Sequence, residues 1–247
     1  MSELSGQTAL ITGSTSGIGR ATALALAARG ATVVVTGRHA ERGAEVVEKI
    51  QADGGTARFV AADLLDPGDV ARLARDAGAV DILVNNAGLG SFGPSADITS
   101  DQYDAMLHGN LRAVYLLTAA LAPKMAERGH GVVINVSSGA GTIGDVNNAV
   151  YGATKAAVNS LTRAWSAEYG PSGVRVNSVA PGPVLTSLPY EWIKGYVPLI
   201  PLRRVAQPED VSEVIAFLAG PGAAYVSGAV IPVDGGLTAA EPPKLVG

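Results

Sequence analysis

Short apolar runs alternate along the whole chain with longer segments of helical periodicity. The runs are continuous and rich in β-branched residues, a pattern typical of strands buried on both faces of a parallel sheet. The predicted strands are 8–12, 32–36, 58–62, 81–85, 132–136, 174–179 and 229–233. The predicted helices are 20–29, 40–52, 67–77, 101–128, 149–169 and 208–219. This alternation predicts a doubly wound α/β fold, since parallel strands need helical crossovers.

No linker or composition shift divides the chain, so the sequence predicts one domain over residues 1–247. The least regular stretch is 181–207, which is rich in proline and aromatic residues. Long irregular segments inside a compact domain are usually functional loops. We therefore expect a substrate loop at about 183–207.

Composition narrows the function classes. The 247 residues include 31 glycines and no cysteine, which excludes disulfides, thiolate chemistry and cysteine-based zinc sites. The net charge is −4, no run of Lys or Arg exceeds two residues, and the three histidines are scattered. Neither nucleic-acid binding nor a metal site is therefore expected. No apolar run is long enough to span a bilayer and no signal peptide is visible, so we expect a cytoplasmic protein without membrane association.

A glycine-rich segment links the first predicted strand to the first helix with the spacing G-x-x-x-G-x-G. Such a loop lets a pyrophosphate approach the backbone and the free N–H groups of the helix. The alternative is a glycine-rich turn without a ligand. No G-K-[ST] follows, which argues against a P-loop. The candidate contacts are Gly13, Ser14, Ser16, Gly17, Ile18 and Gly19.

Tyr151 and Lys155 are four residues apart on a predicted helix, so they share one face. A nearby ammonium is expected to bring the tyrosine pKa down from about 10 toward the working range of a general acid or base. Ser138 lies 13 residues before Tyr151, just beyond a predicted strand. Its hydroxyl could stabilise the substrate oxygen to which Tyr151 would donate a proton. A second pair, Tyr190 and Lys194, falls in the irregular stretch and is interpreted as a coincidence.

These segments together resemble the short-chain dehydrogenase/reductase family in its classical form. The matching positions are the glycine loop, Asp63-Leu64, Asn85-Asn86-Ala87-Gly88, Asn110, Ser138, Tyr151-x-x-x-Lys155, Asn177 and Pro181-Gly182. The resemblance implies a Rossmann-like sheet of about seven strands in the order 3-2-1-4-5-6-7 and a homotetramer. It also implies hydride transfer between a nicotinamide cofactor and a carbonyl or alcohol. Tyr151 would act as general acid/base, Ser138 would orient the oxygen, Lys155 would hold the nicotinamide ribose, and Asn110 would support a proton relay.

The end of the second predicted strand bears on the choice of cofactor. Gly37 stands where NAD-preferring relatives place a carboxylate, and Arg38 can pair with a 2′-phosphate. Many NADP-preferring relatives carry a second basic residue just before the second glycine of the loop, where this sequence has Ser16. NADP(H) is therefore favoured, with NAD(H) as the alternative. The resemblance implies further contacts from Asp63, Leu64, Asn86, Ala87, Gly88, Tyr151, Lys155, Pro181, Gly182, Val184 and Thr186.

The predicted pocket walls suggest a mainly apolar site for a small or medium ketone. Phe92, Tyr190 and Trp192 join Ser138 and Tyr151 as expected substrate contacts. Asp145 is the only ionisable group between Ser138 and Tyr151. Two alternatives stay open: a 3-oxoacyl-thioester (acyl-carrier-protein) reductase of the same family, and a non-catalytic NAD(P)-binding sensor.

Overall fold

Seven parallel strands form one sheet in the computed structural model, which describes residues 2–186 and 190–239. The strand order is β3-β2-β1-β4-β5-β6-β7, as predicted. The strands are β1 (Thr8–Ile11), β2 (Thr32–Gly37), β3 (Thr56–Ala61), β4 (Ile82–Asn85), β5 (Gly131–Val136), β6 (Val174–Pro181) and β7 (Val230–Val233). The order reverses between β1 and β4, where an open parallel sheet forms its ligand crevice.

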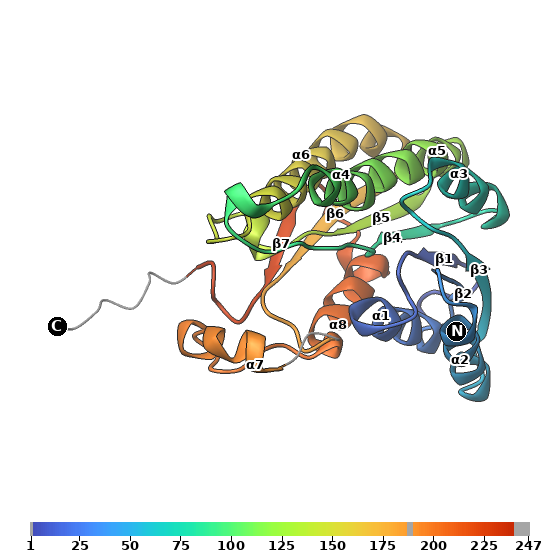
Figure 1. The fold of residues 1–247 in the computed structure, drawn as a ribbon. Helices are drawn as coiled ribbons and strands as arrows, with labels where there is room; N and C mark the ends of the chain where they lie inside the picture. The colour runs from blue at the N-terminus through green and yellow to red at the C-terminus, as the bar shows by residue number, and fades with distance from the viewer. Residues whose placement is uncertain (1, 187–189, 240–247) are drawn as a thin grey trace.

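Helices cover both faces of this sheet (Figure 1). One face carries α1 (Gly17–Ala28), α2 (Ala40–Ala52) and α8 (Pro208–Ala219). The other carries α3 (Pro67–Asp76), α4 (Ser100–Leu107), α5 (Ala113–Arg128) and α6 (Ala149–Tyr169). The short α7 (Tyr190–Ile193) and a 3₁₀ turn, Lys194–Leu199, lie apart from both layers, beyond the carboxyl ends of the strands.

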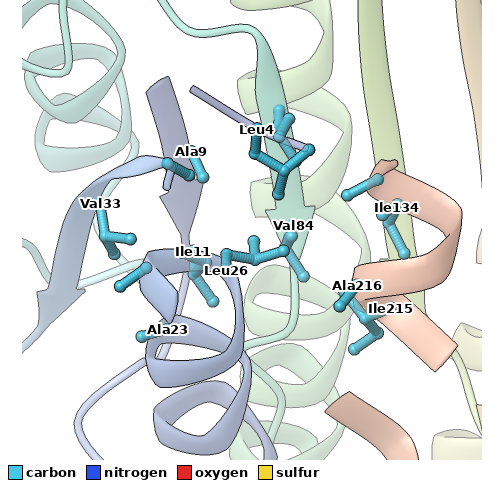
Figure 2. Packing of buried hydrophobic residues seen from close by; sticks show 14 of the residues in the cluster. Leu4, Ala9, Ile11, Ala23, Leu26, Val33, Val84, Ile134, Ile215 and Ala216 are labelled. Carbon is cyan, nitrogen blue, oxygen red and sulfur yellow. The ribbon is translucent and has the colours of Figure 1, made fainter. Parts of the chain in front are cut away.

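Each face buries its own apolar cluster. Figure 2 shows Leu26 of α1 and Ile215 of α8 packed against β1 and β4. The opposite cluster joins α3, α5 and α6 to the strands and includes Leu83 and Leu117. Full burial of one such side chain is worth about 1.5–3 kcal/mol, so the two clusters together hold the helices on the sheet.

Polar side chains inside the central strands are paired with one another. Asn85 on β4 donates to Asn135 on β5 at 2.9 Å and to Thr118 on α5 at 3.1 Å. Asn135 in turn donates to Thr162 on α6 at 2.8 Å. Because water cannot reach these groups, each bond removes a desolvation cost of about 1–3 kcal/mol.

The prediction that every strand is buried on both faces is wrong for β3. Thr56, Arg58 and Ala61 are exposed, and the strand begins at Thr56 rather than at residue 58. The physical reason is that β3 forms one edge of the sheet and pairs with β2 alone. The four-residue β7 forms the other edge and is likewise only partly buried.

The single long helix predicted over 101–128 is also wrong. A π-helical turn, His108–Arg112, separates α4 from α5. Such a turn inserts one residue into the helical repeat and changes which side chains face inward. The irregular stretch predicted over 181–207 contains α7 and the 3₁₀ turn. No helix within residues 2–186 and 190–239 is long and apolar enough to cross a membrane.

Removal of a buried side chain from β4 tests this packing. Leu83 is fully buried between neighbouring strands and α5. We expect Leu83→Ala to lower the free energy of unfolding by about 2–5 kcal/mol, because it leaves a cavity. Urea denaturation at fixed protein concentration measures this loss. The control is Leu202→Ala at a 67% exposed position, where a change within about 0.5 kcal/mol is expected; equal losses in both variants would contradict this description of the core.

Candidate active site

The loops after β1, β4 and β6 meet at the carboxyl edge of the sheet. Gly13 has a φ of +64°, and a Cβ there would lie only 3.1 Å from the Cα of Ala87. Gly17 has a φ of +52°, and a Cβ there would lie 3.1 Å from Cγ2 of Thr186. The structure therefore brings together three of the predicted cofactor segments, and glycine is required for two of the approaches.

Two side chains hold the glycine loop to β4. The Thr12 hydroxyl accepts from the backbone N–H groups of Asn86 and Ala87, both at 2.9 Å. The Asn86 amide donates to the Thr12 carbonyl at 2.8 Å. Sequence reasoning did not single out Thr12, because its partners lie more than 70 residues away in the chain. Its position directly before the first glycine of the loop was the one available signal.

The start of α1 can receive an anion. Its N-cap residue, Ser16, makes no side-chain capping bond, and the first turn contains no acidic residue. The positive end of the helix dipole and the first N–H groups therefore stay available for a phosphate. Ile18 packs against the core below. The hydroxyl of Ser14 is engaged elsewhere, because it donates to the Ile11 carbonyl at 2.8 Å and accepts from Thr36 N at 2.9 Å; only backbone groups of Ser14 fit the predicted role.

The segment after β6 forms the opposite wall of the crevice. Val184 is buried and pairs with Ala206, which holds the strand extension in place. Gly182 packs closely on the backbone of Asp234, and Pro181 is the last residue of β6. Thr186 then lies against the glycine loop. The predicted nicotinamide contacts thus lie opposite the predicted pyrophosphate contacts.

The adenosine end of the candidate site lies at β2 and β3. Gly37 ends β2 against Thr15 of the glycine loop, and Arg38 follows it with an exposed side chain. After β3, one carboxylate oxygen of Asp63 accepts from Leu65 N at 3.0 Å. Leu64 packs on the apolar cluster of α3 and α5. Together with the uncapped helix, this donor set fits a dinucleotide with negatively charged phosphates.

Tyr151 and Lys155 lie on the first turns of α6, next to the end of β5. The Lys155 side chain is only 3% exposed, and its Nζ donates to the Val136 carbonyl at 2.9 Å. The same nitrogen lies 5.6 Å from the centre of the Tyr151 ring. A Cβ on Gly88 would be 3.2 Å from this Nζ, so Gly88 leaves room for the ammonium group.

The expectation that the pKa of Tyr151 is lowered is wrong. Burial raises the pKa of the Tyr151 phenol, and the hydroxyl of Ser138 lowers it to a smaller extent. Lys155 does not offset this effect, because its ammonium is directed to the Val136 carbonyl and is itself desolvated. Burial lowers the pKa of Lys155 to about 8.

Asn110 is completely buried in the π-helical turn rather than in a regular helix. Its amide accepts from Leu89 N at 2.8 Å, donates to Leu89 O at 2.8 Å and donates to Thr154 Oγ1 at 3.2 Å. The side chain therefore fixes the Gly88–Leu89 segment beside Lys155. Because its polar atoms are engaged there, the side chain acts as a positioning group, and its part in a proton relay stays a prediction.

The predicted substrate residues are only partly brought together. Ser138 follows β5 and accepts from Ala140 N at 3.2 Å, and the Phe92 ring packs edge-on against Tyr151 with 5.8 Å between ring centres. Tyr190 instead lines a cavity of about 510 Å³ with Arg203 and Gln207, and neither Ser138 nor Tyr151 lines that cavity. The side chain of Trp192 and residues 187–189 lie outside the described part of the structure.

The second Tyr-x-x-x-Lys pair is structurally separate from the first. Lys194 forms an ion pair with Glu191 on the surface, while Tyr190 is half exposed. This arrangement agrees with the interpretation of the pair as a coincidence of spacing.

The sequence is similar to those of known oxidoreductases along nearly its whole length. Residues 7–195 match the family model described as short chain dehydrogenase. The chain is 39% identical over 240 residues to cis-4-hydroxycyclohexanecarboxylate dehydrogenase of Sinomonas cyclohexanicum. This match covers 94% of this chain and 96% of the relative. It is 35% identical to a 3-oxoacyl-[acyl-carrier-protein] reductase of Thermotoga maritima, over 95% of this chain and 98% of that protein.

A solved structure extends the likeness to three dimensions. A Beutenbergia cavernae protein, provisionally called an NAD(P)-dependent gluconate 5-dehydrogenase and crystallised with NADP at low occupancy, superimposes with a TM-score of 0.93. The two sequences are 38% identical, over 96% of this chain and 99% of the other.

The buried lysine makes stability depend on pH in a defined window. Its pKa is lowered from 10.5 to about 8, so between these values the unfolded chain binds a proton that the folded chain has released. The free energy of unfolding therefore gains a contribution as pH rises through this window. Lys155→Met removes this contribution. Across the window, the free energy of unfolding of wild type should therefore rise relative to that of Lys155→Met by an amount on the order of 3 kcal/mol, and chemical denaturation at several pH values measures it.

The matched control for this measurement is the exposed Lys124 on α5. Lys124→Met should follow the wild-type pH dependence, since an exposed ammonium titrates alike in both states. Parallel curves for wild type and Lys155→Met would show that the buried lysine does not titrate in this window.

Proposed function

The chain belongs to the short-chain dehydrogenase family, and from that premise we propose that it is an NADP(H)-preferring oxidoreductase that interconverts a ketone or aldehyde with an alcohol. NAD(P)-dependent oxidation or reduction at such groups is the chemistry of the family. The observation that carries the proposal is the meeting of Tyr151, Ser138 and the buried Lys155 at the end of β5, beside the uncapped start of α1.

The chain's own residues have distinct parts in the proposed reaction. The bound nicotinamide supplies or accepts the hydride. Tyr151 donates a proton to the substrate oxygen during reduction and receives it during oxidation. Ser138 orients that oxygen and stabilises the charge that develops on it. Lys155 offers its remaining N–H donors toward a ribose, and Asn110 holds the Gly88–Leu89 backbone that shapes its surroundings.

NADP(H) is the cofactor that the end of β2 favours. Gly37 presents no carboxylate, and the exposed Arg38 next to it can form charge-assisted bonds to a 2′-phosphate. The NADP in the Beutenbergia cavernae structure supports the same choice. NAD(H) is the alternative cofactor.

A 3-oxoacyl-thioester reductase is the second candidate, supported by the Thermotoga maritima relative. The half-buried Asp145 and the absence of a basic cluster on the loop 139–148 favour a small ketone over a carrier-protein conjugate. A non-catalytic sensor is disfavoured because Asn110, Ser138, Tyr151 and Lys155 are all in place. We further propose one catalytic domain over residues 1–247, with a substrate loop at about 183–207, that works as a homotetramer in the cytoplasm.

Removal of one hydroxyl tests the proposed acid. We expect Tyr151→Phe to lower kcat at least about 100-fold, since the proton donor is lost while the ring against Phe92 is kept. NADPH binding, followed by cofactor fluorescence, should change little. The matched control, Tyr225→Phe, alters a fully exposed tyrosine and should retain wild-type turnover. Full activity of Tyr151→Phe with a panel of ketones would refute the assignment.

Arg38 provides the test of cofactor preference. Loss of a charge-assisted contact costs about 1.5–3 kcal/mol, so Arg38→Gln should weaken NADPH binding roughly 10- to 100-fold. NADH binding should stay nearly unchanged, because it lacks the 2′-phosphate. Fluorescence titration of both cofactors measures the ratio, with Arg163→Gln on the exposed face of α6 as control. Tighter binding of NADH than of NADPH by the wild type would contradict the preference.

A further inference from the structure

The chain turns sharply where β7 ends, and a buried carboxylate closes this turn. Gly235 and Gly236 both have a left-handed backbone, with φ of +65° and +90°. Oδ1 of Asp234 accepts from Gly236 N at 2.9 Å, and Oδ2 accepts from N and Oγ1 of Thr238 at 2.8 and 2.6 Å. Asp234 is only 7% exposed, and no cation among the described residues pairs with it. The donors of residues 234–238, the β7 turn, therefore hold this charge on their own.

One side of the β7 turn lies against the main chain of Gly182. Gly182 N donates to the Val233 carbonyl at 3.1 Å, and a Cβ on Gly182 would lie only 2.9 Å from both Cα and Cβ of Asp234. The two segments are thus in direct contact, so Asp234 supports the backbone of Gly182. This backbone leads to Val184 and Thr186, which are predicted contacts of the nicotinamide.

The far end of the β7 turn lies against the residue that follows Ser138. A Cβ on Gly139 would lie 3.3 Å from Cγ2 of Thr238 and 3.7 Å from the Pro181 carbonyl oxygen. The threonine methyl group therefore packs on the backbone next to the proposed substrate-orienting hydroxyl. Asp234 fixes this threonine, since the Thr238 hydroxyl and N–H both donate to one carboxylate oxygen.

The loop proposed to contact the substrate rests on the same turn. Leu202 N donates to the Gly235 carbonyl at 3.1 Å, and a Cβ on Gly235 would lie 2.7 Å from Cγ2 of Ile200. Leu237 packs on the apolar cluster that contains Ile200 and Val205. The β7 turn thus contacts three segments of the proposed site that lie far apart in the sequence.

The sheet itself does not hold two of these segments together. The pairing of β5 with β6 ends where Ser137 N donates to the Val179 carbonyl at 2.7 Å. Beyond this bond, no main-chain hydrogen bond among the described residues joins 138–141 to 180–186. Ser138 and Gly182 both lie past this point, and the β7 turn contacts the backbone on each side.

We propose that Asp234 is a positioning residue for the reaction. Through the β7 turn it fixes the backbone beside Ser138 relative to the backbone that leads to the nicotinamide contacts, and so aligns the substrate carbonyl with the hydride. This inference rests on the function proposed above. Asp234 acts through the turn and is not assigned a contact with the substrate or the cofactor.

Amide hydrogen exchange of the free protein tests this coupling. Asp234→Asn keeps the shape of the side chain but leaves one N–H of the turn without an acceptor, because the new amide nitrogen only donates. We expect exchange to become about tenfold faster in 139–143 and 182–186 as well as in 234–239. Protected amides there include Gly141 and Gly182. Faster exchange in 234–239 alone would show that the carboxylate acts only within its own turn and would overturn the proposal.

Kinetics add a readout that a loss of stability does not move. Cyclohexanone serves as substrate, or otherwise the ketone that wild type reduces fastest, with NADPH oxidation followed by absorbance. We expect kcat of Asp234→Asn, counted per NADPH-binding site from fluorescence titration, to be about 10- to 100-fold lower, because a misplacement of about 1 Å is enough for such a loss. The KM for NADPH should change less than about threefold. A variant that is merely less stable would bind fewer NADPH per chain and keep the wild-type kcat per site, which would contradict positioning.

Asp81→Asn is the matched control. Asp81 precedes β4 at the opposite edge of the sheet, where its Oδ2 accepts from Thr8 N at 2.9 Å. This variant also removes a partly buried carboxylate from a backbone N–H, so it should lower stability. It should leave kcat per site and the exchange in 139–143 and 182–186 unchanged. An equal effect of both variants on these segments would show that any loss of stability reaches them, and would overturn the specific role of Asp234.

Thr238→Ser decides the question if Asp234→Asn unfolds the protein, which a uniform rise in exchange would show. Serine keeps both bonds to Asp234 and removes only the methyl group that lies against Gly139. We expect exchange in 139–143 to become about threefold faster and exchange in 182–186 to stay as in wild type. Unchanged exchange in 139–143 would refute the contact through which Asp234 is proposed to act.

Failure of the proposed function would be a separate result, because exchange is measured without substrate or cofactor. A chain that turns over no ketone or alcohol with NADPH or NADH would contradict the proposed function, while the exchange pattern would still decide whether Asp234 couples the segments. Normal turnover in Asp234→Asn would refute the positioning role and leave the proposed function intact.

Discussion

Burial of the sheet on both faces imposes one requirement on every polar group that the central strands carry. With helices above and below, water cannot reach Asn85 or Asn135, so their amides depend on partners within the protein. Both amide nitrogens find such partners, on Asn135 Oδ1 and on threonines of α5 and α6, while Oδ1 of Asn85 has no partner among the described residues. Polar chemistry is thereby confined to the carboxyl edge of the sheet, where the strands end and loops open toward solvent.

Lys155 lies at the boundary between these two regions. Its long side chain passes from α6 into the interior, and its ammonium is held by a single main-chain carbonyl at the end of β5. Burial lowers its pKa to about 8, so the charged form is held only narrowly at neutral pH. A polar ligand that accepts from the free N–H groups would favour the charged form. The same charge would then counter the burial that raises the pKa of the Tyr151 phenol. Burial therefore acts on both groups, since it raises the pKa of the proposed acid Tyr151 and lowers that of Lys155.

The strand order and the four candidate catalytic residues could both be predicted from the sequence, because both depend on local patterns and on the family motifs that carry them. Other features depend on contacts between distant residues. The π-helical turn at Asn110 is invisible to apolar periodicity, since a helix with one inserted residue still reads as helical. The spacing of Tyr151 and Lys155 places them on one face, but it gives neither their burial nor the carbonyl that holds Nζ. Thr12 was missed for a similar reason: its hydroxyl matters only once β1 and β4 are neighbours.

The residues of the proposed site and the loop between Ser138 and Tyr151 are held in place by different parts of the fold. Tyr151 and Lys155 are positioned by a long helix and by a strand end, whose packing fills the core. Asp145 belongs to a loop that contributes little to that core and is fixed by two local bonds, one from Gly93 to the Asn147 carbonyl and one from Asn148 to the carboxylate. Because this loop runs from Ser138 to Tyr151, its two ends are held by β5 and α6, the same elements that position the two hydroxyls.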